Sequence, residues 1–249
     1  MGYKLYRLDQ KTSIKSTVSF DELDNKPFWC KLGNQKEEAF VSLMAHLKTK
    51  YIVSIHPEKA SDQYHPDLLV EIDAESYTGE VKIKNSPLFY AHRYGVDRQY
   101  ALTMDLKDSF NYCRLLKAGI DLLIFIWVNW EAHEMANDYG EHFSVRPMEG
   151  VWLTQFSKLR EMEVSQNPPA IHWYKEKFRQ PTIHKEEHWC NQLLEFEPRL
   201  RLQNGTVKNI TSNGYISSES GSFPAGNSSC SYVFELSNKS IFENLWLKA

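Results

Sequence analysis

Residues 65–85, HPDLLVEIDAESYTGEVKIKN, contain two stretches in which apolar and polar residues alternate. Side chains alternate between the two faces of a strand, so this pattern predicts two β-strands that each bury one face. The side chains expected to cover the core are Leu68, Val70, Ile72, Val81 and Ile83. A two-residue connection at Asp73-Ala74 would join the two strands into a hairpin.

The opposite face of this hairpin would carry Asp67, Glu80 and Lys82. With the turn at Asp73-Ala74, Asp67 lies opposite Glu80, where directly paired side chains interact. Carboxylate oxygens are the ligands that Mg²⁺ prefers in proteins. The hairpin therefore predicts a magnesium site with a lysine two residues beyond one of its carboxylates.

The segments around the hairpin predict an α/β sheet flanked by helices. Apolar residues recur at helical spacing in residues 33–50 and again in residues 96–117, where Gly119 would end the second helix. Residues 51–56 read as a strand before the hairpin. Residues 121–130, DLLIFIWVNW, are apolar on both faces, as a central strand would be.

The pattern changes after about residue 150. GVWLTQFSKLREM (150–162) predicts a short strand that leads into a helix, and SQNPPA (165–170) reads as a break in the chain. Short β-like runs then alternate with segments rich in Gly, Ser and Asn. We therefore predict a domain over residues 1–165 and a β-rich C-terminal extension over residues 166–249, to which the sequence assigns no function.

Composition is that of a globular protein, because 42% of the 249 residues are hydrophobic and 24% are charged. The longest apolar run, residues 122–128, is too short to cross a bilayer, and the N-terminal MGYKLYRLDQKTS lacks the apolar segment of a signal peptide. The four cysteines form no CxxC pair, which favours reduced thiols. We therefore expect a cytoplasmic protein without a membrane partner. A net charge of −3 excludes a uniformly basic surface, so any phosphate binding would be local.

The spacing of Pro66-Asp67, twelve intervening residues and then Glu80-Val81-Lys82 resembles the signature of the PD-(D/E)XK nuclease superfamily. The predicted order of elements over residues 33–130 is similar to the αβββαβ core of the restriction-endonuclease-like fold. This resemblance implies a Mg²⁺-dependent nuclease, with Mn²⁺ as a possible substitute, that hydrolyses phosphodiester bonds in DNA. An endonuclease of restriction, repair or mobile-element type is the expected class.

The resemblance also implies roles for individual residues. Asp67 and Glu80 would hold the metal together with the backbone carbonyl of Val81. Lys82 would act on the attacking water or on the scissile phosphate, where an ammonium group stabilises negative charge.

Members of the superfamily often add an acidic residue from the first helix. Glu37 and Glu38 are the candidates here. At 100° per residue, Glu37 lies at the edge of the apolar stripe of the helix and Glu38 points almost the opposite way. We therefore expect Glu37 to join the site.

Basic residues after the hairpin predict contacts with the DNA backbone. Residues 82–117 contain seven Lys or Arg against three Asp. We expect DNA contacts from this segment, some of them at the start of the second predicted helix. The candidates are Lys84, Arg93, Arg98 and Gln99. A homodimer on DNA is also expected, because cleavage of both strands usually uses two sites.

Two alternatives stay open. The stretch from His184 to His188, HKEEH, matches the HxxEH pattern of inverted zinc proteases, with Glu187 as the base. That pattern makes a zinc metalloprotease a minor alternative. A non-catalytic DNA-binding or assembly protein on the same scaffold is the other.

Overall fold

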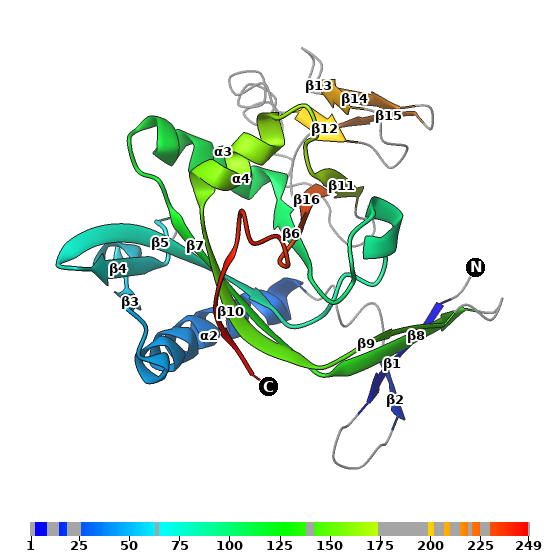
Figure 1. The fold of residues 1–249 in the computed structure, drawn as a ribbon, viewed down its shortest axis with the longest axis horizontal. Coiled ribbons are helices and arrows are strands. Elements are labelled where there is room, and N and C mark those ends of the chain that lie inside the picture. Colours follow the sequence, from blue (N-terminus) through cyan, green and yellow to red (C-terminus); the bar gives the residue numbers. More distant parts are fainter. Residues whose placement is uncertain are drawn as a thin grey trace. The chain divides into compact units, whose positions relative to one another are not determined.

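The computed structural model describes residues 3–8, 15–18, 26–62, 65–137, 142–173, 199–201, 207–209, 215–218, 221–224 and 230–248. The fold is mixed α/β with a predominance of strands (Figure 1). The chain forms two compact units. The first comprises Met1–Phe89, Leu122–Gln155 and Asn238–Ala249, and the second comprises Tyr90–Asp121 and Phe156–Ser237. Each unit is therefore assembled from separate stretches of sequence.

A mixed six-stranded sheet forms the centre of the first unit, with the strand order β17-β10-β7-β5-β4-β3. Strands β5 and β7 are parallel, and the other neighbours in this sheet are antiparallel. The predicted strand in DLLIFIWVNW is confirmed as β7, which lies between β5 and β10 as a central strand should. The strands are β3 (Ile52–Ile55), β4 (Leu68–Ile72), β5 (Glu75–Lys84), β7 (Leu123–Trp130), β10 (Met148–Gln155) and β17 (Glu243–Leu247).

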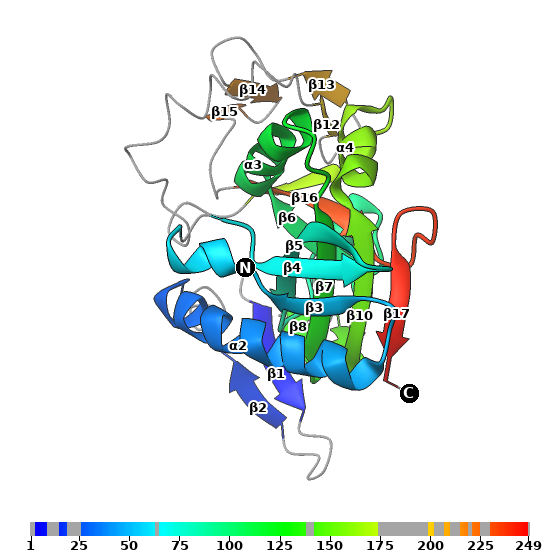
Figure 2. The same ribbon diagram turned by 90° about the vertical axis from the view of Figure 1, so that its left-hand side faces the viewer.

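Helix α2 (Lys26–Leu47) packs on one face of this sheet (Figure 2). Phe40 of α2 is fully buried, and its ring centroid lies 5.6 Å from that of Phe125 and 6.0 Å from that of Trp127. The helix begins seven residues before the predicted residue 33. It ends where Lys48 takes a φ of 50°, outside the helical region.

The predicted hairpin is confirmed. Strands β4 and β5 pair from Leu68↔Gly79 to Ile72↔Glu75, and the two-residue turn falls at Asp73-Ala74. Both turn residues have positive φ, 50° and 68°, as a type I′ hairpin turn requires. The apolar face predicted for the hairpin packs in the same hydrophobic core as Phe40.

A second sheet in the first unit continues the β7–β10 pair. Strands β8 and β9 follow β7 and precede β10, so that the two pairs form one long antiparallel ribbon (Figure 1). The N-terminal strands add to the edge of β8, which gives the order β2-β1-β8-β9. The strands are β1 (Tyr3–Leu8), β2 (Lys15–Val18), β8 (Ala132–Asn137) and β9 (His142–Val145).

The second unit contains a five-stranded sheet with the order β13-β12-β11-β16-β6 and a separate pair, β14-β15. Its helices are α3 (Leu106–Lys117) and α4 (Phe156–Val164). None of the helices in the described residues is both long enough and apolar enough to cross a membrane. The strands are β6 (Ala101–Asp105), β11 (Ala170–Trp173), β12 (Arg199–Arg201), β13 (Val207–Asn209), β14 (Tyr215–Ser218), β15 (Gly221–Pro224) and β16 (Cys230–Glu235).

The helix predicted over residues 96–117 is wrong in its first half. Ala101–Asp105 is strand β6, which pairs antiparallel with β16 from Glu235↔Ala101 to Ser231↔Asp105. Helix α3 begins only at Leu106. The predicted end is confirmed, because Gly119 has a φ of 88° and its N–H donates to the Leu116 carbonyl at 3.0 Å.

The predicted boundary at residue 165 falls inside the second unit, which includes both α4 and β11. The described part of residues 166–249 consists mainly of strands, as predicted. Its last strand, β17, belongs to the first unit and pairs with β10. The HKEEH stretch lies outside the described residues.

Glu163 is a fully buried carboxyl group on α4. Both of its carboxylate oxygens lie 2.7 Å from the Ser109 hydroxyl, and Arg160 Nη1 lies 3.2 Å from Oε2. Burial raises the pKa of Glu163 to about 7, against the pull of the Arg160 charge and the hydrogen bonds. The folded chain therefore holds a proton there at a pH where the unfolded chain has released it.

This difference predicts that the free energy of unfolding falls as the pH rises from 4.5, the ordinary pKa, to about 7. The contribution of one such group is at most about 1.4 kcal/mol per pH unit. Glu163→Gln should flatten this dependence in urea unfolding at pH 5 and pH 7.5. Glu161→Gln, an exposed neighbour on the same helix, should behave as the wild type. Equal pH dependence in Glu163→Gln and wild type would contradict the assignment.

Candidate functional site

Asp67 and Glu80 lie side by side at one end of the hairpin. Asp67 immediately precedes β4, and its backbone N–H donates to Glu80 Oε2 at 3.4 Å. The backbone N–H of Val81 donates in turn to Asp67 Oδ2 at 3.3 Å. Both carboxylates are largely shielded, since each side chain is 14% exposed. The hairpin register therefore gives the two acids fixed positions.

Lys82 lies on the same face of β5 as Glu80, as alternation along the strand requires. Its Nζ donates to Glu80 Oε1 at 2.9 Å. Val81 contributes the N–H described above, whereas the metal-ligand role of its carbonyl stays a prediction. The hairpin thus brings together the acid pair and the lysine that the sequence predicts.

Glu37, on α2, is linked to Asp67 by a lysine that contacts both carboxylates. Lys59 Nζ lies 2.6 Å from Glu37 Oε2 and also forms an ion pair with Asp67 Oδ1. Glu38 is exposed and has no ion pair with this lysine. Of the two helix acids, the structure therefore places Glu37 beside the hairpin.

We call these five side chains the carboxylate cluster: Glu37, Asp67, Glu80, Lys59 and Lys82. Their exposed fractions range from 14% to 20%. Two like charges about 4 Å apart repel by about 4 kcal/mol at an effective dielectric constant of about 20. Three acids in so small a region therefore need cations, and two ammonium groups supply them here.

The electrostatics of Lys59 reflect this demand. Burial alone lowers its pKa, but the hydrogen bonds and negative charges of Asp67 and Glu37 outweigh burial, so the pKa is raised. Lys59 is therefore held as a cation between two acids. The acids of the cluster therefore favour a positive charge beside Asp67, where the sequence predicts a metal ion.

Lys59 is not among the site residues predicted from the sequence, because its segment has only the composition of a turn. The residue belongs to η1 (Pro57–Ala60), a short 3₁₀ helix with Pro57 in its first turn. His56 precedes η1, and its Nδ1 accepts a hydrogen bond from the Glu58 N–H at 3.3 Å. Proline after a capping residue is a recognisable helix start. That signal predicts the turn but not the partners of its lysine.

The predicted DNA contacts divide between the two units. Lys84 ends β5 in the first unit and is half-buried, whereas Arg93, Arg98 and Gln99 belong to the second. The predicted place of Arg98 and Gln99 at a helix start is wrong, because they lie in the turn before β6. Gln99 is 8% exposed, which leaves it little surface for DNA. Arg93 is exposed in η2 (Ala91–Tyr94), with its guanidinium 4.4 Å from the Tyr90 ring centroid.

No protein-family model, curated protein or solved structure matches this chain. The interpretation of the carboxylate cluster therefore depends on its own residues and their chemistry.

Removal of the bridging ammonium group should expose the repulsion between the acids. We expect Lys59→Met to lower the free energy of unfolding in EDTA by about 1–3 kcal/mol, the usual cost of leaving a buried hydrogen-bonding group without its partner. Mg²⁺ should then raise the melting temperature of Lys59→Met more than that of the wild type, because it replaces the lost cation. Lys158→Met, at an exposed position on α4, serves as the control. Equal Mg²⁺ responses in Lys59→Met and wild type would show that Mg²⁺ does not take the place of the Lys59 ammonium group.

Proposed function

We propose that this chain is a Mg²⁺-dependent nuclease of the PD-(D/E)XK type that hydrolyses phosphodiester bonds in DNA. The observation that carries the proposal is the pair of acids, Asp67 and Glu80, which the hairpin holds side by side. Lys82 and Glu37 lie at the same cluster, as such a site requires.

The order α2, β3, β4, β5, α3 and β7 supports a restriction-endonuclease-like core. Both β6 and α3 depart from this order, because they belong to the second unit and β6 pairs in the sheet of that unit. The first unit itself contains α2, β3, β4, β5 and β7 in the expected order.

The residues of the cluster fit a magnesium ion. Asp67 and Glu80 offer carboxylate oxygens from one short hairpin, and a cation, Lys59 Nζ, already contacts Asp67. Mg²⁺ held by these acids would polarise the phosphate and make a bound water more acidic. The site therefore offers the donor chemistry and the charge balance that the proposed ion needs.

Lys82 has the position for the remaining chemistry. Its ammonium group contacts Glu80 and so lies within a side chain's reach of any phosphate bound at the two acids. A positive charge there neutralises the phosphate as negative charge develops in the transition state. Glu37 would hold Lys59, or a second water, on the helix side of the cluster.

A non-catalytic DNA-binding protein is the second candidate, and one observation favours it. Lys59 pairs with both Glu37 and Asp67, so the acids of the site are already partly neutralised without a metal. On this alternative, Lys59 would replace the metal permanently. Mg²⁺ would then neither stabilise the protein nor support cleavage.

The proposal predicts separate effects for Lys82 and Asp67. Lys82→Ala should lower cleavage by at least about 100-fold, the usual scale for loss of one group that stabilises charge in the transition state. It should keep the Mg²⁺-induced rise in melting temperature, because the two acids remain. Asp67→Asn should lose both cleavage and the Mg²⁺ response.

The measurement is cleavage of linear, circular and single-stranded DNA at saturating Mg²⁺ and substrate, beside melting curves with and without Mg²⁺. Lys158→Ala, in the second unit, controls for the loss of a surface charge. Wild-type turnover by Lys82→Ala would contradict the proposed role of this lysine. A wild type that binds DNA but neither cleaves it nor responds to Mg²⁺ would favour the non-catalytic candidate.

We expect Arg93 to contribute to DNA affinity and not to the rate of cleavage. Phosphate contacts release counterions, so Arg93→Ala should weaken DNA binding and reduce the slope of log K against log salt concentration by about one unit. Turnover at saturating DNA should stay close to that of the wild type. Binding isotherms at several salt concentrations test this, with Arg114→Ala on α3 as a matched exposed arginine. An unchanged slope in Arg93→Ala would place the phosphate contacts elsewhere.

A further inference from the structure

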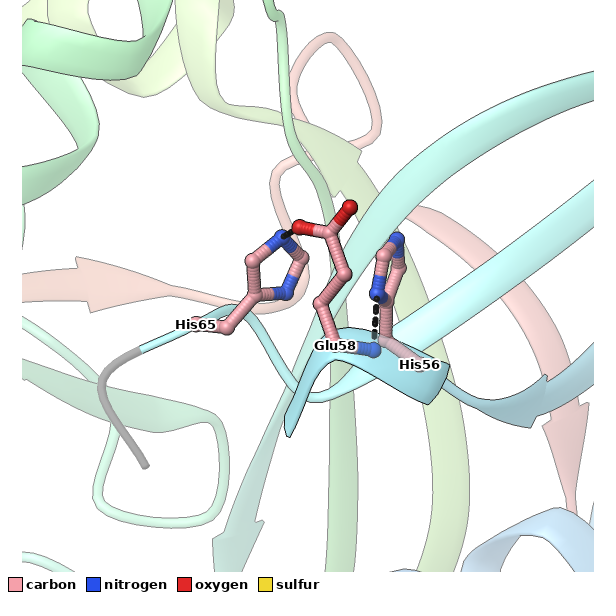
Figure 3. A group of neighbouring side chains, drawn as sticks. All are labelled: His56, Glu58 and His65. Carbon is pink, nitrogen blue, oxygen red and sulfur yellow. Dashed lines mark hydrogen bonds and ion pairs between the residues drawn. The ribbon is translucent and has the colours of Figure 1, made fainter. Parts of the chain in front are cut away.

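A second group of metal-ligating side chains lies just before the hairpin, at His56, Glu58 and His65. One potential ligand atom from each residue lies within 4.8 Å of the others. Figure 3 shows the Glu58 carboxylate beside the two imidazole rings. We call these three residues the histidine cluster. It shares no residue with the carboxylate cluster.

The backbone brings the two histidines together although they are nine residues apart. The His56 N–H donates to the Asp67 carbonyl at 2.9 Å, which closes the loop between them. The His65 N–H donates to the Asp62 carbonyl at 3.0 Å. The two ring centroids lie 4.0 Å apart, and the ring planes are tilted by 33°. The proximity of the rings is therefore supported by backbone hydrogen bonds that require no metal.

His65 is oriented as a metal-ligating histidine usually is. Its Nδ1 lies 3.0 Å from the Pro66 carbonyl oxygen, which can only accept, so Nδ1 carries the proton. In the neutral ring the lone pair then resides on Nε2. Ligating histidines characteristically donate their other N–H to a backbone carbonyl or carboxylate in this way.

The lone pair on His65 Nε2 faces another acceptor. Glu58 Oε2 lies 3.0 Å from this nitrogen. Two acceptors at this distance repel unless a cation lies between them or binds both, and that cation is either a proton or a metal ion. The contact therefore marks a place where a metal could replace a proton.

His56 completes the group from the other side. Its Nδ1 accepts the Glu58 N–H at 3.3 Å, a long hydrogen bond that fixes the ring beside the Glu58 side chain. Glu58 itself is 68% exposed at its side chain, so a metal ion and its waters have access from solvent. Because Nδ1 accepts this bond, the neutral His56 ring carries its proton on Nε2, and binding of a metal by either ring nitrogen would replace the hydrogen bond from the Glu58 N–H. The cluster thus has three potential donors and an open side.

We infer that His56, Glu58 and His65 bind one divalent transition-metal ion of the Zn²⁺ class, with water in the remaining positions. Two imidazole nitrogens and one carboxylate oxygen suit Zn²⁺ and its neighbours in the first transition row. Mg²⁺ prefers an all-oxygen shell and would not compete well here. The inference goes beyond the proposed nuclease function and does not depend on it.

The test uses the full chain, stripped with EDTA, dialysed and titrated with Zn²⁺ against a chromophoric chelator. We expect one Zn²⁺ ion that millimolar Mg²⁺ does not displace. His65→Ala and Glu58→Gln should each weaken it by more than about tenfold, because loss of even an outer-shell partner typically costs 10–100-fold. The control is His142→Ala, since His142 Nε2 lies 3.4 Å from Glu134 Oε2 in a single His–Glu pair without a second histidine.

Glu58→Gln guards against a folding artefact, because its exposed side chain should leave the melting temperature in EDTA unchanged. Wild-type Zn²⁺ affinity in both His65→Ala and Glu58→Gln would overturn the inference. So would loss of Zn²⁺ only when His184 and His188 are replaced, which would place the ion at HKEEH. Asp67→Asn separates the two sites: it should keep Zn²⁺ and lose the Mg²⁺ response, so failure of the nuclease proposal and failure of this inference appear in different variants.

Discussion

The register of the β4–β5 hairpin is the constraint on which the candidate site depends. Leu68 pairs with Gly79, so Asp67 and Glu80 meet one residue further along, on the face opposite the core. A slip of one residue would turn the apolar side chains to solvent and separate the acids. The Asp73-Ala74 turn and the apolar face therefore fix the site and the fold at once. Gly79 adds to this restriction, since a Cβ there would lie 2.8 Å from a Val70 methyl group.

Ion pairs between acidic and lysine side chains link the hairpin to α2 and η1. The acids at Glu37, Asp67 and Glu80 come from a helix and from the two arms of the hairpin, and each is mostly shielded from water. Lys59 links the helix acid to the hairpin acid, and Lys82 neutralises the third. The raised pKa of Lys59 shows that attraction to its partners exceeds the penalty of burial. On the proposed function, added Mg²⁺ would compete with Lys59 for the same acids.

The segment from His56 to Asp67 contributes donors of two chemical kinds within twelve residues. Glu58 and Lys59 are neighbours in η1, yet Glu58 contacts the histidine cluster and Lys59 contacts the carboxylate cluster. Nitrogen-containing and all-oxygen donor sets select different ions. The proposed magnesium site and the inferred transition-metal site would therefore draw ligands of different kinds from one short loop.

The sequence by itself determined the features that depend on local pattern. These are the hairpin and its turn, the apolar stripe of α2, the central strand β7, the Gly119 helix end and the grouping of Asp67, Glu80 and Lys82. Tertiary structure decided the features that depend on distant partners. Residues 101–105 follow a helical pattern yet form β6, because they pair with residues 231–235 of β16, which are far away in the sequence. Distant contacts also determine the partners of Lys59, the contact between His56 and His65, and the way in which each unit is assembled from separate stretches of sequence. Residue periodicity does not encode these contacts.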